Sequence, residues 1–515
     1  MRSLPRAIAW RLLPLLQCFV DFFLPHTMTE PPQNTSTPSG KFIPLYQAKS
    51  KVYPRAIDGV FNRWRWVMVW ITQLVFYGLP WLQWGERQMV LFDLEARRFY
   101  LFGLVLYPQD FIYLTGLLII SALSLFLFTA VAGRLWCGFT CPQTVYTEIF
   151  MWLENRIEGE RSTRMRLDKA PWSSWEKIWR KSAKQLAWVA VALWTGFTFV
   201  GFFVPIRALG SEILALQGSW QIFWMLFYAF ATYGFAGHMR EQVCKYMCPY
   251  ARFQSAMFDK DTLIVTYDSA RGEPRGARSK KVDAKAAGLG DCIDCSLCVQ
   301  VCPTGIDIRN GLQYECIGCG LCVDACDSVM DKVQLPRGLI RYSTENALAR
   351  HYSARDNLAH LMRPRTLIYS AILLIIVAAT AWSLATRIPL RVDVIRDRAM
   401  LYREADNEQI ENVFSLHVMN TDERPRRYRI EVNGIEGASI VGEQIVEVPA
   451  ASNKNFLVVV TVKDGAAPKG SNKIMFDIRA ADDGRVGRVA GGAGERTSRV
   501  WGWFQQAGHG GESLC

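Results

Sequence analysis

Five apolar stretches, each close to the roughly 20 residues that cross a bilayer, constrain the fold of this chain most strongly. They cover residues 67–84, 111–132, 186–205, 220–237 and 367–386. Buried helices of a large soluble core are the alternative interpretation. Runs of this length, bounded by turn or charged residues, favour membrane spans instead. We therefore expect an α-helical membrane protein with five transmembrane helices.

The composition agrees with this fold class. The chain has 515 residues, of which 50% are hydrophobic and 21% charged, and its formal net charge is +12. These values exclude a disordered chain, a coiled coil and a small disulfide scaffold. No RNA- or DNA-binding signature accompanies the positive charge, and basic loops beside membrane helices explain it more simply. We expect a membrane as partner and no nucleic acid.

The distribution of Lys and Arg sets the expected orientation of the spans. Basic residues gather before the first span and between the second and third, in residues 49–65 and 156–184. Residues 85–110 carry mixed charges, and residues 206–219 carry few. Because basic loops stay in the cytoplasm, the amino end and the segment after the fourth span are predicted inside. The tail after the fifth span is predicted outside.

The first 27 residues resemble a signal sequence only in part. Three arginines precede an apolar run, but Pro14, Asp21 and Pro25 interrupt it and no small-residue cleavage site follows. An additional span here would reverse every later loop against its charge. We expect Met28 to be the true start, with residues 1–27 as upstream translation; a signal-like leader is the alternative.

The carboxyl-terminal part changes to a β pattern. Short runs of alternating or β-branched residues are separated by turn signals such as Asn433-Gly434 and Asp464-Gly465, and residues 482–496 are expected to form a loop. About seven strands with such spacing predict an immunoglobulin-like β-sandwich. The expected strands cover residues 391–396, 410–420, 426–433, 439–448, 454–463, 473–480 and 499–504.

Eight of the fourteen cysteines fall in one short segment and give the strongest functional signal. They form two successive C-x2-C-x2-C-x3-C runs, a spacing typical of bacterial ferredoxins with two [4Fe–4S] clusters. The runs are Cys292, Cys295, Cys298 and Cys302, then Cys316, Cys319, Cys322 and Cys326. Zinc, the alternative, needs two-plus-two ligand sets and does not use eight thiolates in this register.

The fourth cysteine of each run is expected to bind the cluster of the other run. Cluster one then takes Cys292, Cys295, Cys298 and Cys326, and cluster two takes Cys302, Cys316, Cys319 and Cys322. Small residues such as Gly318 and Gly320 let backbone amides approach the sulfur atoms. Asp327 stands where the second run usually has proline, which removes no ligand.

These segments predict a definite domain order. The expected parts are an N-terminal tail (1–63), a four-helix transmembrane domain (64–237), a cytoplasmic segment (238–365) with a ferredoxin domain at about 285–335, a fifth transmembrane helix (366–386) and a periplasmic immunoglobulin-like domain (387–515).

Four further cysteines form two C-x3-C-P motifs, one after the second span and one after the fourth. They are Cys137 with Cys141, and Cys244 with Cys248. Positions i and i+4 share a helix face, so each pair could bind one metal ion or form a disulfide, and each proline is expected to begin a new helix. Binding of a soft metal such as Cu(I) and reversible dithiol chemistry are the functional interpretations. Buried free cysteine is the structural one.

Residues near these motifs carry weaker signals. His238, Met239 and Met247 offer copper-binding atoms, although single His and Met residues at a membrane edge more often serve packing. Arg134 and Arg240 are expected to anchor at lipid headgroups. No phosphate loop, dinucleotide fingerprint or Ser-His-Asp constellation stands out.

The order of these features resembles the FixG/CcoG/RdxA family of cytochrome c oxidase accessory proteins. Residues 136–154 (WCGFTCPQTVYTEIFMWLE) and 244–259 (CKYMCPYARFQSAMFD) are similar to that family's signatures. The resemblance covers about 52–504, and residues 1–27 and Asp327 fit it least. It implies a bacterial inner-membrane protein needed to assemble the cbb-type haem–copper oxidase. It also implies electron transfer from iron–sulfur clusters to Cu(II), with the four C-x3-C-P thiols receiving copper.

We therefore expect a membrane-bound cupric reductase that supplies Cu(I) for oxidase assembly, with assembly factors or copper chaperones as partners. Two alternatives stay open. A quinol dehydrogenase-like membrane ferredoxin shares four spans, C-x3-C-P motifs and two clusters, but the fifth span and the external sandwich argue against it. A redox-sensing assembly scaffold would use the clusters without catalysis. A homodimer would let cysteine pairs meet across two copies.

Overall fold

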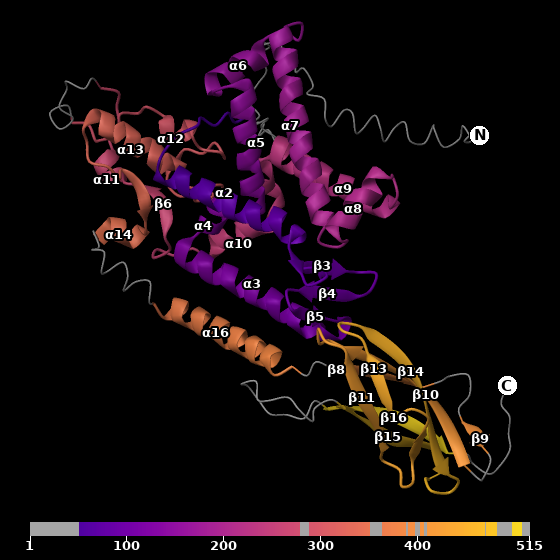
Figure 1. Ribbon diagram of the computed structural model, residues 1–515. Coiled ribbons are helices and arrows are strands. Elements are labelled where there is room, and N and C mark those ends of the chain that lie inside the picture. The colour runs from indigo at the N-terminus through magenta and orange to yellow at the C-terminus, as the bar shows by residue number, and fades with distance from the viewer. Residues whose placement is uncertain are drawn as a thin grey trace, which may run out of the picture. The chain divides into compact units, whose positions relative to one another are not determined.

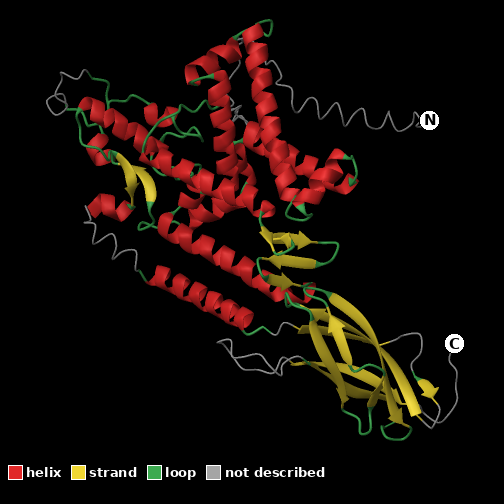
Figure 2. Cartoon of the chain, viewed as in Figure 1, coloured by secondary structure: helices red, strands yellow, loops and turns green. Residues whose placement is uncertain are grey.

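The computed structural model describes residues 51–278, 288–350, 363–387, 390–396, 402–405, 409–468, 470–481 and 497–506. The expected upstream or signal-like segment (1–27) and the expected loop 482–496 lie outside the described residues. Helices dominate the chain up to the last long helix, and strands dominate after it (Figure 1, Figure 2).

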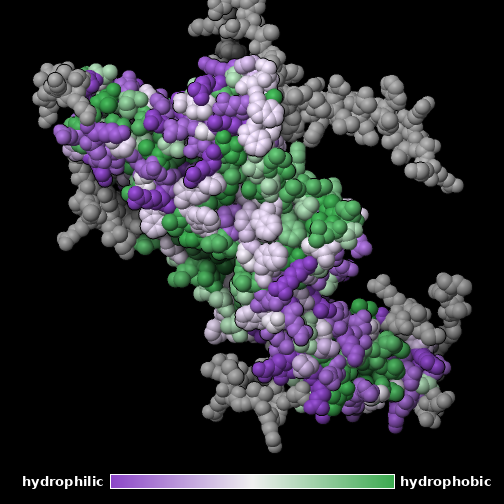
Figure 3. All heavy atoms as spheres, turned by 45° about the horizontal axis from the view of Figure 1, so that its top comes forward, coloured by the Kyte–Doolittle hydropathy of each residue, from purple (hydrophilic) through white to green (hydrophobic). Residues whose placement is uncertain are grey.

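Three helical segments in the described part of the chain are long and apolar enough to cross a membrane. They are α3 with the short η2 before it (Pro108–Ala132), α7 (Trp175–Val200) and α16 (Pro364–Ala385). A fourth candidate is the pair of α8 (Ile206–Leu214) with α9 and η3 (Ser219–Met239), bent by 100°. On the face shown in Figure 3, hydrophobic side chains gather over the helical part.

The first expected span, residues 67–84, is not confirmed as one. Helix α2 covers Val60–Gly78 and gives way to the 3-10 turn η1 (Leu79–Trp81). It begins before Arg63 and Arg65, and these charges reduce the apolarity of the helix that forms. Helix α2 is therefore not among the described helices that are long and apolar enough to cross a membrane. Five spans are not established.

The helices pack through aromatic and small residues. Trp188 of α7 stacks on Phe150 of α5 (Pro142–Glu158), with ring centroids 5.3 Å apart, and its indole N–H donates to the Phe150 carbonyl at 3.1 Å. Gly196 of α7 lies directly against the backbone of α9 at Met225, where no side chain fits. Such close approach through a small residue is common between membrane helices, and it fixes α5, α7 and α9 as one unit.

The cysteine-rich segment folds around short elements. They are α10 (Pro249–Met257), β6 (Ile264–Tyr267), α11 (Ser269–Gly272), α12 (Leu297–Gln300), η5 (Ile308–Asn310), α13 (Leu321–Val333), β7 (Ile340–Ser343) and α14 (Glu345–Arg350). Strands β6 and β7 pair antiparallel and close the segment on itself. Its buried core includes Val265, Ile306, Met330 and Leu339, packed around the cysteines.

The carboxyl-terminal part is a two-sheet β-sandwich, as the sequence predicts. One sheet has the order β12-β14-β10-β8 with β9 beside β10, and the other has the order β13-β11-β15-β16. The strands are β8 (Leu390–Arg396), β9 (Arg403–Ala405), β10 (Gln409–Asn420), β11 (Arg426–Asn433), β12 (Ser439–Val441), β13 (Ile445–Val448), β14 (Asn453–Lys463), β15 (Gly470–Ala480) and β16 (Thr497–Gln506). Phe414 and Phe476 meet between the sheets, with centroids 5.3 Å apart.

The sandwich differs from the expected strands at one point. Residues 439–448 were predicted as a single strand, but they form β12 and β13, which belong to different sheets. Gly442 between them has a φ of 110°, a conformation that side chains other than glycine rarely adopt. The chain can therefore cross from one sheet to the other at this glycine.

Residues 83–106 form small sheets that the sequence pattern does not reveal. The strands are β1 (Gln83–Trp84), β2 (Arg87–Gln88), β3 (Val90–Asp93), β4 (Arg98–Leu101) and β5 (Leu104–Leu106). Asp110, which follows them, is buried and pairs with Arg387 and, at 3.1 Å, with Arg391. These ion pairs tie the start of α3 to the residues that follow α16.

Candidate functional site

The first cavity of the cysteine-rich segment is lined by the four cysteines expected for cluster one. They are Cys292, Cys295, Cys298 and Cys326. Cys298 comes from α12 and Cys326 from α13, so residues of both runs meet there. Of the four, Cys295 is exposed. The first cavity therefore lies close to the surface of the segment at Cys295.

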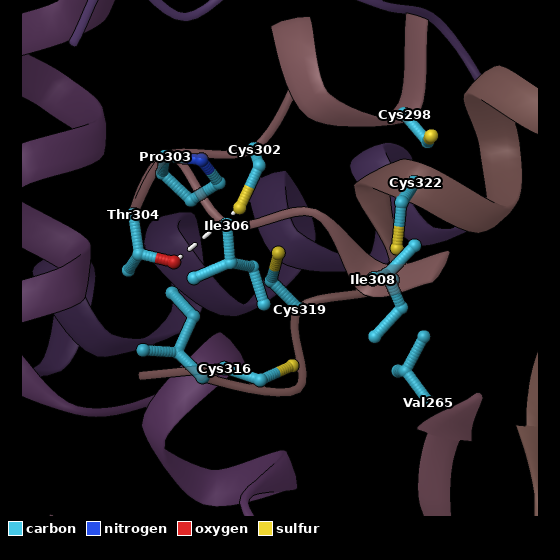
Figure 4. Close-up of a pocket in the computed structure, with 12 residues that line it drawn as sticks. Val265, Cys298, Cys302, Pro303, Thr304, Ile306, Ile308, Cys316, Cys319 and Cys322 are labelled. Carbon is cyan, nitrogen blue, oxygen red and sulfur yellow. Dashed lines mark hydrogen bonds between the residues drawn. The ribbon is translucent and has the colours of Figure 1, made fainter. Parts of the chain in front are cut away.

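The second cavity is lined by the four cysteines expected for cluster two, together with Cys298. The four are Cys302, Cys316, Cys319 and Cys322. Figure 4 shows their sulfur atoms facing a shared space, with Cys298 set apart. Aliphatic side chains such as Val265, Ile306 and Ile308 form the rest of the wall. Because Cys298 borders both cavities, the two sites are neighbours.

The two cysteine runs share one backbone conformation. Gly318 and Gly320 in the second run have positive φ values of 63° and 75°. Asp294 and Ser296 at the matching positions of the first run have φ values of 53° and 54°. A positive φ is uncommon for residues other than glycine, and strain of this kind is often kept at functional sites. The first run thus folds like the second despite having no glycine there.

The donor set fits an iron–sulfur cubane better than a single metal ion. All described cysteines are free, and no group of three or more His, Cys, Asp or Glu side chains in the described residues closes around one ion. A cubane binds each thiolate to a different iron, so its ligands surround a cavity. Burial raises the pKa of the Cys298 thiol to about 11 and that of Cys316 to about 12. Metal coordination would remove these protons.

The two C-x3-C-P motifs are built alike. Cys141 ends the turn after α4 (Leu135–Phe139), and its amide donates to the Trp136 carbonyl at 3.0 Å. Cys248 ends η4 (Val243–Met247), and its amide donates to the Val243 carbonyl at 2.8 Å. Pro142 and Pro249 then begin α5 and α10, as predicted.

Neither motif keeps the expected α-helical geometry: in the first, α4 ends at Phe139, before Cys141, and the second departs further. Both η3 and η4 are π-helical, and Arg240 between them has a φ of 40°. Cys244 lies on η4, so it does not share a simple α-helical face with Cys248. Single turns of π-helix are rare and are found frequently at functional sites.

The structure brings the two motifs into contact, because Sγ of Cys137 donates to Oε1 of Gln254 at 3.5 Å, and Gln254 lies on α10, the helix that follows Cys248. Burial, with added contributions from Cys141 and Cys248, raises the pKa of the Cys137 thiol to about 11. Burial likewise raises the pKa of the Cys244 thiol to about 12, with added contributions from Cys141, Cys137 and Cys248. The four thiols therefore share one neighbourhood, but no three of them close around a single ion within the described residues.

These four thiols lie next to the second cavity. A Cβ atom added to Gly138 would lie 2.8 Å from the Gly318 carbonyl oxygen and 2.9 Å from the Cys319 Cα. Cys137 packs in the same apolar cluster as Cys319 and Cys322. The backbone of the first C-x3-C-P motif is therefore in direct contact with the loop that lines the second cavity.

A carboxylate between two of the cysteines holds this segment against α2. Asp324 of α13 accepts hydrogen bonds from the amides of Phe61 at 3.2 Å and Asn62 at 2.8 Å. A carboxylate at a helix amino end satisfies otherwise unpaired amides and faces the positive end of the helix dipole. Gly59 leaves room for it. Sequence reasoning missed this contact, because it joins residues far apart in the chain.

The expected headgroup role of Arg134 and Arg240 is wrong. Both side chains are buried: Arg134 donates to backbone carbonyls, and Arg240 pairs with Glu154 at 2.7 Å. Buried arginines need such acceptors, because an unpaired charge is costly away from water. His238 lies edge-on to Trp188, with centroids 6.0 Å apart, which favours its packing role.

Three models of protein families match the chain. One described as a 4Fe–4S dicluster domain matches residues 239–345, and one described as a 4Fe–4S binding domain matches residues 114–159. A third, described as the immunoglobulin-like fold at the C-terminus of FixG, matches residues 380–490. The chain is therefore an iron–sulfur protein whose carboxyl-terminal domain is of the FixG type.

Curated relatives cover most of the chain. Nitrogen fixation protein FixG of Rhizobium meliloti is 38% identical over 77% of this chain and 82% of its own length. Protein RdxA of Cereibacter sphaeroides is 38% identical over 86% of this chain and 95% of its own length. Protein RdxB of the same organism is 36% identical over 88% and 95%, respectively. With such identity over nearly its full length, this chain belongs to the FixG/RdxA family of iron–sulfur proteins.

Proposed function

We propose that this protein is a membrane-bound cupric reductase that supplies Cu(I) for assembly of a cbb-type cytochrome oxidase. The observation that carries the proposal is the contact between the four-thiol group and the loop of the second cavity. A soft-metal ligand set thus stands beside a predicted electron carrier, with Gly138 against Cys319.

Each group of residues has a separate task. Two [4Fe–4S] clusters, held by the eight cysteines that line the two cavities, would supply single electrons. The C-x3-C-P thiols receive the copper substrate, because Cu(I) prefers thiolates whereas Cu(II) prefers nitrogen and oxygen ligands. One electron reduces one Cu(II) to Cu(I), and the thiols then hold the reduced ion until it leaves.

The proposed location is the bacterial inner membrane, crossed several times. Support comes from α3, α7, α16 and the bent pair around α9, which are apolar and long enough. We propose that the cysteine-rich part lies in the cytoplasm and the sandwich in the periplasm, because basic loops stay on the cytoplasmic side. We propose that copper chaperones or oxidase assembly factors bind on that outer side.

The direct test uses the native protein purified without oxygen. Chemically reduced protein should convert Cu(II) to Cu(I), detected with a Cu(I)-specific chelator, while the EPR signal of reduced clusters disappears in a one-to-one ratio. Reoxidation by a quinone but not by Cu(II) would favour the quinol dehydrogenase alternative. Absence of iron from the preparation would contradict every redox role.

A valine at Gly138 should slow the transfer of electrons to copper by roughly 10–100-fold. Its side chain would collide with the backbone at Gly318 and Cys319 and push the loop of the second cavity away from the thiols. The measurement is the stopped-flow rate of cluster oxidation after Cu(II) is added. Iron content should stay at the native level.

The matched control for this variant is Gly210→Val. Gly210 also lies in a helix, but an added Cβ there meets nothing within 4 Å. It should leave the rate of cluster oxidation unchanged. A native rate in Gly138→Val, with the collision present, would show that electrons do not leave through this contact.

A further inference from the structure

A single buried arginine connects both thiol motifs with the second cavity. Arg134 occupies the turn between α3 and α4, immediately before the first motif. Its Nη1 donates to the carbonyls of Tyr314 and, at 3.3 Å, Cys316, which precede and begin the second cysteine run. Its Nη2 donates to the carbonyl of Ala251, which follows the second motif on α10.

The backbone of Arg134 adds to this bridge. A Cβ atom on Gly318 would lie 3.3 Å from the Arg134 carbonyl carbon. The loop that lines the second cavity, named the cluster-two loop below, therefore also packs against the turn that carries Arg134. Three segments far apart in the chain thus meet at one residue. A guanidinium group can serve them together because it has five N–H donors in a rigid planar fork.

The charge of Arg134 faces sulfur instead of carboxylate. The side chain is 6% exposed, and no ion pair with Asp or Glu is formed within the described residues. The acidic groups that act on it most are the thiols of Cys137, Cys316, Cys244 and Cys248. In the opposite direction, its charge lowers the pKa of the Cys137, Cys244 and Cys316 thiols against the stronger effect of burial.

We propose that Arg134 is the positioning residue that holds the cluster-two loop against both C-x3-C-P motifs, and that its fixed positive charge favours arrival of the electron there. Only the purpose of this arrangement, delivery of electrons to copper, rests on the proposed function. The contacts of Arg134 do not depend on copper. A guanidinium group stays protonated in proteins, so its charge is permanent. Adding an electron to cluster two adds negative charge, which a buried cation stabilises strongly because screening is weak.

Two substitutions separate the charge from the geometry. Arg134→Gln removes the charge, so cluster two should be at least tenfold less reduced at a fixed potential, which equals 59 mV for a one-electron couple. Arg134→Lys keeps the charge and should keep the native midpoint, but lysine cannot bridge three carbonyls. The midpoint is read by EPR-monitored redox titration of the full-length protein.

The geometry is read by cross-linking. A short bifunctional thiol reagent should join Cys137 to Cys244 in native protein, and both substitutions should lower the yield at least tenfold. Arg387→Gln is the control, because the Arg387 side chain is also nearly buried (5% exposed) but pairs with Asp110, at the end of α3 away from Arg134. It should change neither the midpoint nor the cross-linking.

Each outcome decides one point. An unchanged midpoint in Arg134→Gln, or an equal shift in Arg134→Lys, overturns the charge role. Native cross-linking in both variants overturns the positioning role, and if Arg134→Gln assembles no clusters, Arg134→Lys alone decides. Failure of the native protein to reduce Cu(II), with these shifts present, would reject the proposed function and leave the inference standing.

Discussion

Replacing the four C-x3-C-P thiols together by serine is expected to lower copper reduction by at least about 100-fold. The substituted residues are Cys137, Cys141, Cys244 and Cys248. Losing groups that merely orient a metal ligand costs up to about 100-fold, so losing the ligands themselves should cost no less. Cluster absorbance should persist, because the eight ferredoxin cysteines are intact. The measurement is Cu(I) formation by the reduced protein, with iron content determined in parallel.

The paired variants test whether the thiols act as one group. If the four sulfur atoms form a single copper site, Cys137→Ser/Cys141→Ser alone should cost nearly as much as the quadruple change. Cys244→Ser/Cys248→Ser should do the same, because effects of residues that act as a unit are not additive. Two independent sites would leave about half of the activity in each paired variant. A native rate in the quadruple variant would show that these cysteines do not bind the copper that is reduced.

The parts of the site that could be predicted are those encoded by local spacing. The C-x2-C-x2-C-x3-C runs define tight loops, so the grouping of Cys326 with the first run and Cys302 with the second follows from the pattern; which cysteines bind which cluster is still a prediction. Pro142 and Pro249 correctly indicated where α5 and α10 begin, because proline fits the first turn of a helix. Alternation of residues likewise predicted the sandwich.

The parts that could not be predicted depend on residues far apart in the chain. Asp324 caps α2 across more than 260 positions, and no local pattern signals such a partner. Arg134 looked like a headgroup anchor because its acceptors are backbone carbonyls, which every sequence has. The strands within 83–106 are only two to four residues long, too short for alternation to be visible. No residue pattern in the sequence indicates the π-helical turn that carries Cys244.

A buried ion network ties the second motif to the helical bundle. Glu154 of α5 is 1% exposed and lies 2.7 Å from Arg240, 3.3 Å from Arg164 of α6 (Arg161–Lys169) and 3.7 Å from Lys184 of α7. Arg240 stands directly between η3 and η4, so Glu154 fixes the segment that carries Cys244. Burial alone would raise the pKa of the Glu154 carboxyl, but the three cations outweigh it and lower that pKa to about 2.

Glutamine at position 154 is therefore expected to destabilise the protein by about 3 kcal/mol at pH 7, because it leaves Arg240 and Arg164 without their carboxylate and Lys184 with Glu158 alone. The native pKa lies below the unfolded value of about 4.3, so the stabilisation is fully present above that pH. It should decline as the pH falls from about 4 towards 2, and the difference between native protein and Glu154→Gln should shrink in that window. Thermal unfolding in detergent, followed by tryptophan fluorescence at each pH, measures this difference.

Glu176→Gln, which removes an exposed carboxylate paired with Arg180, should leave the unfolding temperature nearly unchanged. Equal unfolding temperatures for native protein and Glu154→Gln at pH 7 would mean that the network does not hold the second motif in place.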